Sequence, residues 1–254
     1  MISLPVAGAQ RDSWEGLLDV ASIHPDGWTI VGGQLTYLHL VERSFPYPRP
    51  TADLDAVIDV RGNHPTAVQD FVNAMREVGF TSPIPTPDGH QHRWVRGRAQ
   101  IDILVPRGLS QNRSDGHRTG AGRVTTIATA GGQFVLDRSS AVTVNLDGRM
   151  GEVNAPDLLG ALFGKCSAIL NYLDINKERH FDDILMLASV TDYEQMDELA
   201  ALRLHELKRL QSGIRQALDS KSVWAGPGVV AENTSGFLHQ VALQTAAFEP
   251  DSSR

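Results

Sequence analysis

The chain has 254 residues, of which 41% are hydrophobic and 21% charged, a composition that excludes a disordered or collagen-like protein. It carries 23 Lys and Arg against 30 Asp and Glu, and a formal net charge of −7 disfavours binding nucleic acid or an anionic membrane over its whole surface. The single cysteine, Cys166, excludes an internal disulfide framework and a multi-cysteine zinc site, and we expect it to be a small buried hydrophobe.

No targeting or membrane segment is predicted. The first fifteen residues, MISLPVAGAQRDSWE, contain neither a basic stretch nor a sustained apolar stretch. No apolar run approaches the ~20 residues that span a bilayer. We therefore expect a soluble cytoplasmic protein with no membrane partner.

The first part of the chain alternates between helical and extended patterns. A short β-rich run at Trp28 ends at Gly32-Gly33, and three prolines within 45–50 prevent the next helix from continuing. Apolar residues at helical spacing predict the helices, and β-rich apolar runs predict the strands. In chain order we expect a helix at 13–23, a strand at 28–31, a helix at 34–43, a strand at 54–60 and a helix at 64–80.

The middle of the chain is predicted to be a β-meander, and the end is predicted to be helical. Strands are expected at 93–95 and 99–105 around a tight turn at 96–98, and, beyond a polar loop at 106–122, at 124–127, 133–136 and 141–144. Asn154 and Pro156 predict a helix start, and Thr191 with Glu194 predicts a capping box. Helices are expected at 158–173, 180–190, 193–218 and 237–247. The fold class is therefore α/β (α+β), with a mixed α/β domain at 1–150 and a helical domain at 151–254.

The most informative pattern is Gly32-Gly33, a helix, and then Asp53-Leu54-Asp55 entering a strand. Asp53 and Asp55 point to the same side of an extended chain, because side chains alternate with a period of two. Paired carboxylates provide oxygen ligands for hard divalent cations. A Gly-Gly pair before a helix lets the backbone approach a phosphate at the helix N-terminus. The pattern therefore predicts a cradle for magnesium and a triphosphate.

Asp102 strengthens this prediction. It is flanked by aliphatic residues in a strand that could lie beside Asp53 and Asp55, and an isolated charge there would be costly to remove from water. A third metal ligand is one interpretation of Asp102. The alternative is a salt bridge to Arg96 or Arg98. Taken separately, D-x-D and Gly-Gly are common, and the alternatives are a solvated strand end and a plain turn.

In order along the chain, these residues resemble the nucleotidyltransferase superfamily of the DNA polymerase β type, and within it the AbiEii/MenT-like toxins. The family's first motif corresponds to Gly32-Gly33 and Asp53-Leu54-Asp55. Its later motif corresponds to the helix with Lys165, followed by Arg179-His180 and Asp183. The resemblance covers about residues 28–187. It departs from the family in a longer stretch between Gly33 and Asp53, and in Arg-His where many relatives have Lys-Asp.

The resemblance implies a polymerase β-type core and a role for each matching residue. Two Mg²⁺ or Mn²⁺ ions would be held by three carboxylates, those of Asp53, Asp55 and Asp102. The terminal phosphates of an NTP would be held by Gly32, Gly33 and the backbone of Gln34. In the helical half, Lys165 would neutralise the triphosphate, Asp183 would orient Lys165 or the base, and Arg179 would contact the nucleotide. For Lys165 the alternative is a surface lysine, and for Asp183 and Asp182 it is a helix-surface acid.

The implied activity is transfer of an NMP from an NTP to an acceptor hydroxyl. By resemblance the acceptor is a tRNA 3′ end and the protein is a toxin of a toxin–antitoxin or phage-defence system with a cognate antitoxin. Basic stretches at 107–123 and 203–215 could contact RNA phosphates, although a solvated helix explains the second equally well. His92 and Arg93 could face the acceptor, with a surface turn as the simpler explanation. Three alternatives remain open: a protein or small-molecule acceptor, a non-catalytic nucleotide-binding or interaction module, and a D-x-D glycosyltransferase.

Overall fold

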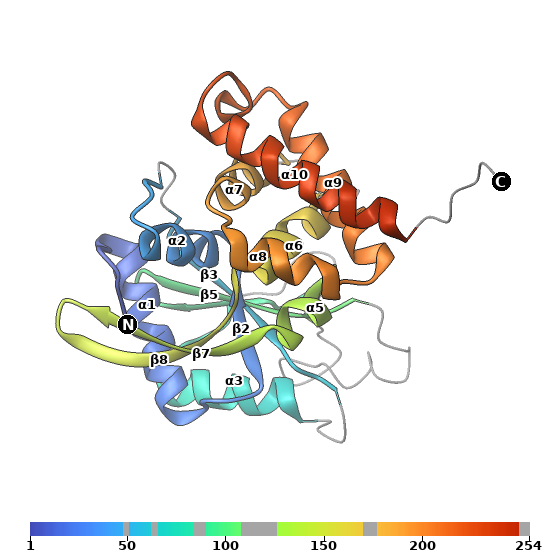
Figure 1. Cartoon of the computed structure of the whole chain (residues 1–254). Coiled ribbons are helices and arrows are strands. Elements are labelled where there is room, and N and C mark those ends of the chain that lie inside the picture. Colours follow the sequence, from blue (N-terminus) through green and yellow to red (C-terminus); the bar gives the residue numbers. More distant parts are fainter. Residues whose placement is uncertain (48–50, 62–65, 84–89, 108–125, 170–176, 249–254) are drawn as a thin grey trace. The chain divides into compact units, whose positions relative to one another are not determined.

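The computed structural model describes residues 1–47, 51–61, 66–83, 90–107, 126–169 and 177–248 (Figure 1). The chain divides into two compact units, Met1–Asp157 and Leu158–Arg254. The expected boundary at residue 150 falls within strand β8 (Arg149–Pro156), which belongs entirely to the first unit.

The first unit is built on a five-stranded mixed sheet, as the sequence predicted. Its strand order is β2-β3-β5-β4, and β6 also pairs with β5. β3 and β6 run parallel to β5, whereas β2 is antiparallel to β3 and β4 is antiparallel to β5. The strands are β2 (Trp28–Val31), β3 (Asp53–Ile58), β4 (Arg93–Arg96), β5 (Ala99–Pro106) and β6 (Ile127–Thr129).

The predicted β-meander was wrong, because its last part belongs to a second sheet of three strands. It has the order β1-β7-β8, from β1 (Ile2–Ser3), β7 (Ser139–Leu146) and β8. Residues 133–136, predicted as a strand, lie instead in the short helix α5 (Gly132–Asp137). Asn154 and Pro156 belong to β8 and do not start a helix, because the segment alternates, with Val153 and Ala155 buried on either side of the more exposed Asn154.

Three helices cover the large sheet. α1 (Gly8–Ile23) packs on β3 and β5, and also on β8 of the second sheet. α2 (Gly32–Glu42) packs on β2 and β3, and α3 (Ala67–Glu77) packs on β3. These confirm the helices predicted at 13–23, 34–43 and 64–80, apart from 64 and 65, which lie outside the described residues. The apolar stripe of α3 is buried because it follows helical spacing; its members are Val68, Phe71, Val72, Ala74 and Met75.

The second unit is entirely helical in its described residues, as predicted. α6, α7, α9 and α10 pack against one another around a core that includes Cys166. Burial raises the pKa of the Cys166 thiol, so this residue is the inert buried group that the sequence predicted. The helices are α6 (Leu158–Ala168), α7 (Glu178–Ser189), α8 (Tyr193–Glu198), α9 (Leu204–Leu218) and α10 (Val229–Ala247), with short 3₁₀ turns η1 (Leu199–Ala201) and η2 (Val223–Ala225).

Two local predictions in this unit were wrong. The helix expected to be continuous over 193–218 is broken at Leu202 and Arg203, whose backbones are extended. The cap of α8 is Asp192, which accepts from the Glu194 N–H at 2.9 Å, and not Thr191. The Gln195 side-chain oxygen accepts from the Asp192 N–H, so the capping box is shifted by one residue from the predicted one.

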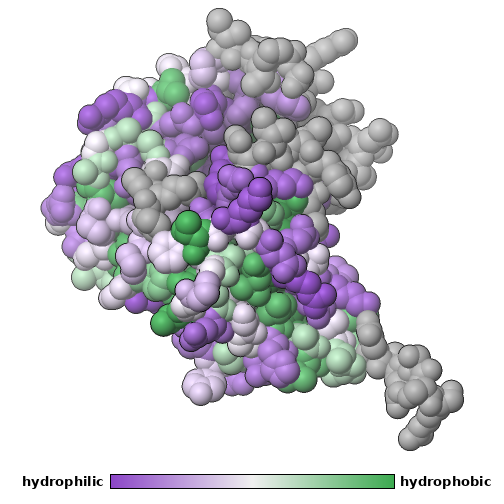
Figure 2. Space-filling view, turned by 90° about the horizontal axis from the view of Figure 1, so that it is seen from above, coloured by the Kyte–Doolittle hydropathy of each residue, from purple (hydrophilic) through white to green (hydrophobic). Residues whose placement is uncertain are grey.

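Several large hydrophobic residues of the described segments are exposed. Tyr193, Val223 and Met150 are each more than half exposed. On the face drawn in Figure 2, hydrophilic residues surround separate hydrophobic patches. Within the described residues, no helix is both long enough and apolar enough to cross a bilayer.

Candidate active site

Three carboxylates lie on one face of the large sheet. Asp53 and Asp55 share a face of β3, and the parallel register places Asp55 directly beside Asp102 of β5. Leu54 and Ile101 point to the opposite face and are fully buried. β5 therefore lies beside β3 as the sequence predicted, and it brings Asp102 next to the D-x-D pair.

Gly32 brings the start of α2 against this carboxylate row. β2 ends at Val31, which pairs with Asp55, and α2 begins at the next residue. Gly32 has a φ of 75°, and a Cβ built on it would lie 1.9 Å from Asp55 Oδ2. A Cβ on Gly33 would lie 2.7 Å from Thr51 Cγ2. The two glycines therefore leave space for the segment that carries the D-x-D pair, and a side chain at either position would fill it.

Gly32→Ala should destabilise the protein more than Gly33→Ala. An alanine at Gly32 has to adopt a left-handed backbone, which costs about 1–2 kcal/mol, and its methyl group also collides with Asp55. At Gly33 the backbone φ is not positive, and the alanine methyl meets only the end of the Thr51 side chain. Thermal unfolding of both variants tests this order, and an equal loss of stability would show that Gly32 is not constrained as described.

The side chain of Gln34 has a structural role in addition to the role predicted for its backbone, which stays a prediction. Its fully buried side chain accepts hydrogen bonds from Trp14 Nε1 at 2.8 Å and Gln10 Nε2 at 3.1 Å. It donates to the Thr51 carbonyl, and the Thr51 hydroxyl in turn donates to Asp53 Oδ1. The side chain of Gln34 thus links α1 to the segment that holds Asp53, a positioning role that the sequence analysis missed together with Thr51.

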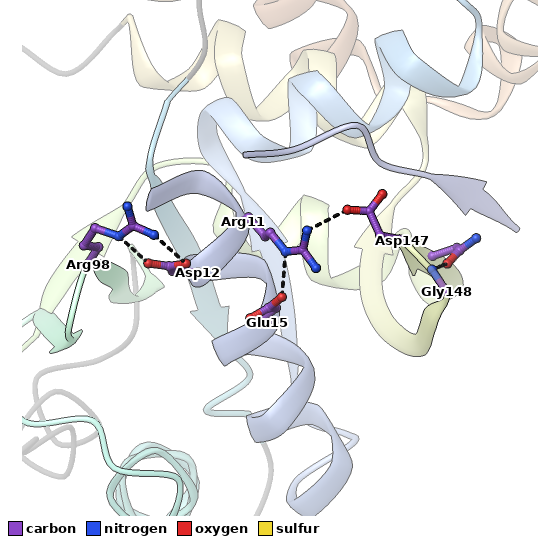
Figure 3. A network of polar contacts seen from close by, with 7 residues as sticks. Arg11, Asp12, Glu15, Arg98, Asp147 and Gly148 are labelled. Atoms are coloured by element: carbon purple, nitrogen blue, oxygen red, sulfur yellow. Dashed lines mark hydrogen bonds and ion pairs between the residues drawn. The ribbon is translucent and has the colours of Figure 1, made fainter. Parts of the chain in front are cut away.

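Asp102 forms an ion pair, but not with either predicted arginine. It is 6% exposed, and Arg93 donates to both of its oxygens, from Nε at 3.1 Å and from Nη2 at 2.9 Å. Arg96 instead reaches Asp19 at 2.7 Å. Arg98 reaches Asp12 on α1 at 2.7 Å (Figure 3). The surface turn expected at Arg93 was therefore wrong, since Arg93 is the first residue of β4 and faces Asp102 in register.

Arg93 interacts electrostatically with all three carboxylates. Its pKa is raised above the ordinary value first by the hydrogen bond to Asp102, and then by the charges of Asp102, Asp53 and Asp55, against the opposing effect of burial. Nearby, His92 Nδ1 is buried without a hydrogen-bond partner, and burial lowers the pKa of His92. Among the described residues, the Arg93 guanidinium therefore serves as a counter-charge to the carboxylate face.

The donor set fits a hard divalent cation by its chemistry. All three predicted ligands offer carboxylate oxygens, which Mg²⁺ and Mn²⁺ prefer. As the side chains lie, no three or more Asp, Glu, His or Cys residues in the described segments form an assembled metal site. Coordination by Asp53, Asp55 and Asp102 would therefore need their side chains to rearrange, and the assignment of these residues as ligands stays a prediction.

In the second unit, Lys165 and Asp183 form a buried pair. Lys165 Nζ of α6 donates to Asp183 Oδ2 of α7 at 2.5 Å, and the two residues are 6% and 0% exposed. Neither is the surface residue that the alternatives described. Asp182 is half-buried and accepts from Ser222 Oγ at 2.6 Å, and Arg179 is exposed in the first turn of α7. The nucleotide-directed roles of Lys165, Asp183 and Arg179 stay predictions.

The two basic stretches differ in what the structure describes. Residues 108–123 of the first lie outside the described residues. In the second, Arg203 pairs with the buried carboxylate of Glu206 at the start of α9. Arg209 lies over the Phe163 ring, 5.7 Å from its centroid. Part of this positive charge therefore stabilises the helical unit, and Lys208 and Arg215 remain on the exposed side of α9.

Comparison with known proteins adds one similar structure. No protein-family profile matches the chain, and no curated protein sequence matches it. The chain is similar to the crystal structure of an antigenic nucleotidyltransferase-like protein from Paracoccidioides brasiliensis, with 14% identity and a TM-score of 0.48 over 90% of this chain and 93% of that one. The chemistry of the site therefore rests on this chain's own geometry.

Proposed function

We propose that this chain is a metal-dependent nucleotidyltransferase, which moves an NMP from an NTP to an acceptor hydroxyl and releases pyrophosphate. The observation that carries the proposal is the register of Asp55 beside Asp102, with the start of α2 at Gly32 lying against Asp55. Carboxylates on adjacent strands, next to a helix N-terminus, combine a cation site with a phosphate site.

Each residue of the site has a defined task in this reaction. Asp53, Asp55 and Asp102 would hold Mg²⁺ or Mn²⁺, which stabilises charge on the attacking and leaving oxygens. The backbone N–H groups of Gly33 and Gln34 would bind the terminal phosphates, since no side chain caps the start of α2. Asp102 would accept the proton of the acceptor hydroxyl. The new bond joins that oxygen to the α-phosphorus, and the bond to pyrophosphate breaks.

The finer part of the proposal concerns the acceptor. The order of motifs resembles the AbiEii/MenT-like toxins, and on that resemblance we propose a tRNA 3′ end as acceptor and a cognate antitoxin as partner. With a net charge of −7, contacts with RNA would be confined to local basic patches. A protein hydroxyl or a small-molecule hydroxyl is the alternative acceptor.

Label transfer tests the proposal. The purified protein is incubated with Mg²⁺ or Mn²⁺ and each of the four α-³²P-labelled NTPs, with total tRNA, a cell protein extract or an aminoglycoside as acceptor. We expect transfer from one NTP to tRNA, abolished by EDTA, and no transfer from the same NTP labelled at the γ-phosphate. Transfer of γ-label without α-label would instead identify a kinase.

A non-catalytic nucleotide-binding module is the second candidate, and the ion pair between Asp102 and Arg93 favours it. In such a module Asp102 would remain paired, and the start of α2 would bind the triphosphate without chemistry. NTP binding that is measurable by calorimetry, but unaffected by EDTA and unaccompanied by label transfer, would establish this function.

A further inference from the structure

We propose that Arg93 is a positioning residue that competes with the divalent cation for Asp102, so that metal loading requires the guanidinium to release this carboxylate. The inference rests on the proposed metal-dependent function, and it concerns a residue outside the motifs that predicted the site. It assigns to β4 a direct influence on the metal affinity of ligands carried by β3 and β5.

The geometry places Arg93 in contact with both oxygens of the Asp102 carboxylate. Antiparallel pairing of β4 and β5 places the two residues opposite each other, and Nε and Nη2 donate to both carboxylate oxygens. When the Gln100 side-chain amide is turned so that its oxygen faces Arg93, that oxygen accepts from the same two nitrogens, each at 3.0 Å. A forked guanidinium bound in this way takes one in-plane lone pair of each oxygen, the two that a bidentate metal contact would use. Arg93 and a cation therefore cannot both take Asp102 in full.

The charges make this competition consequential. Asp102 is nearly buried, and a buried carboxylate without a partner is costly, so Arg93 stabilises it when no cation is bound. A divalent cation would balance the same three negative charges. The Arg93 side chain is 47% exposed, which gives it room to withdraw towards solvent. The energy of the Arg93–Asp102 pair is thus subtracted from the binding energy of the metal.

Arg98 provides a matched control on the same hairpin. It also forms a forked ion pair, with Asp12 on α1 (Figure 3), and Asp12 is not one of the three predicted metal ligands. Arg98→Gln and Arg93→Gln remove the same charge and break the same kind of contact. Only Arg93→Gln removes a competitor of the metal.

The test is binding of Mn²⁺ alone, without nucleotide, measured from the EPR signal of the free ion. For Arg93→Gln we expect the dissociation constant to fall by about tenfold, the size of change typical of groups that contact metal ligands. Arg98→Gln should leave the dissociation constant unchanged. Arg93→Lys keeps the charge but not the forked contact, so its dissociation constant should lie between those of the wild type and Arg93→Gln. In EDTA, Arg93→Gln should also melt at a lower temperature than Arg98→Gln, because only it leaves Asp102 without its counter-charge.

Failure of this inference differs from failure of the proposed function. If Asp102→Asn abolishes Mn²⁺ binding but Arg93→Gln binds as the wild type does, or more weakly, the competition is refuted and the metal site stands. If neither the wild type nor Arg93→Gln binds Mn²⁺, the metal-dependent function fails and the inference fails with it.

Discussion

Asp55→Asn should reduce nucleotidyl transfer by at least about a thousandfold, or about 4 kcal/mol of transition-state stabilisation, because the proposed metal site would lose one of its carboxylate ligands. Asp55 lies next to both other parts of the candidate site. It is in register with Asp102, and its Oδ2 lies against the backbone of Gly32. An amide has the same shape but only one neutral oxygen to offer, so the cation would lose a charged ligand. The single-turnover rate of α-label transfer measures the loss.

The fold should survive this substitution. Asp55 is only half-buried, and removing its charge lessens the repulsion between neighbouring carboxylates on the sheet. Asp12→Asn is the matched control, since it removes a carboxylate from an ion pair, that with Arg98, outside the carboxylate face. An Asp55→Asn protein that melts with the wild type and still transfers label at the wild-type rate would refute the proposed activity.

The carboxylate face could be predicted from sequence because its signals are local. D-x-D on an extended chain fixes two side chains on one side, and Gly-Gly before a helix marks a close backbone approach. Asp102 could also be predicted, since an acid between aliphatic residues requires a partner. What the sequence analysis missed was the identity of that partner, because the identity depends on strand register.

The register was nevertheless encoded in the turn between β4 and β5. Arg96 pairs with Ala99, so the loop consists of two residues, Gly97 and Arg98, with Gly97 in the left-handed conformation at a φ of 59°. A two-residue loop sets Arg93 opposite Asp102. Interpreting 96–98 as a three-residue turn shifts the pairing by one residue, and a shift of one residue exchanges the two faces of a strand.

The second hairpin was missed for a similar reason. Asp147 and Gly148, both with positive φ, join β7 to β8 in a two-residue turn, and Asp-Gly is among the strongest hairpin signals. In the sequence, Asn154 and Pro156 instead favour the start of a helix, and this conflicting signal hides the second strand of the hairpin. The break at Leu202 and Arg203 has no comparable local signal, and it depends on packing within the helical unit, where Leu199 and Leu202 are both buried.

Lys165→Met should cost about 3–5 kcal/mol of folding stability, the usual consequence of removing one partner from a buried ion pair. The Lys165 ammonium lies 2.5 Å from Asp183 Oδ2, and Asp183 is fully buried. Methionine fills similar space but leaves the Asp183 charge without this cation. Urea denaturation measures the loss, and Lys221→Met, at an exposed lysine of the same unit, should change stability little.

The double variant Lys165→Met/Asp183→Leu separates the structural contribution of the pair from its predicted catalytic one. Replacing both charges by apolar groups removes the buried carboxylate that has lost Lys165, so the double variant should be more stable than Lys165→Met. If Lys165 also neutralises the triphosphate, as the resemblance implies, the double variant should fold and still fail to transfer label. A double variant that folds and transfers label at the wild-type rate would limit the pair to holding α6 against α7. A double variant no more stable than Lys165→Met would show that the stability lost in Lys165→Met does not come from separating Asp183 from Lys165.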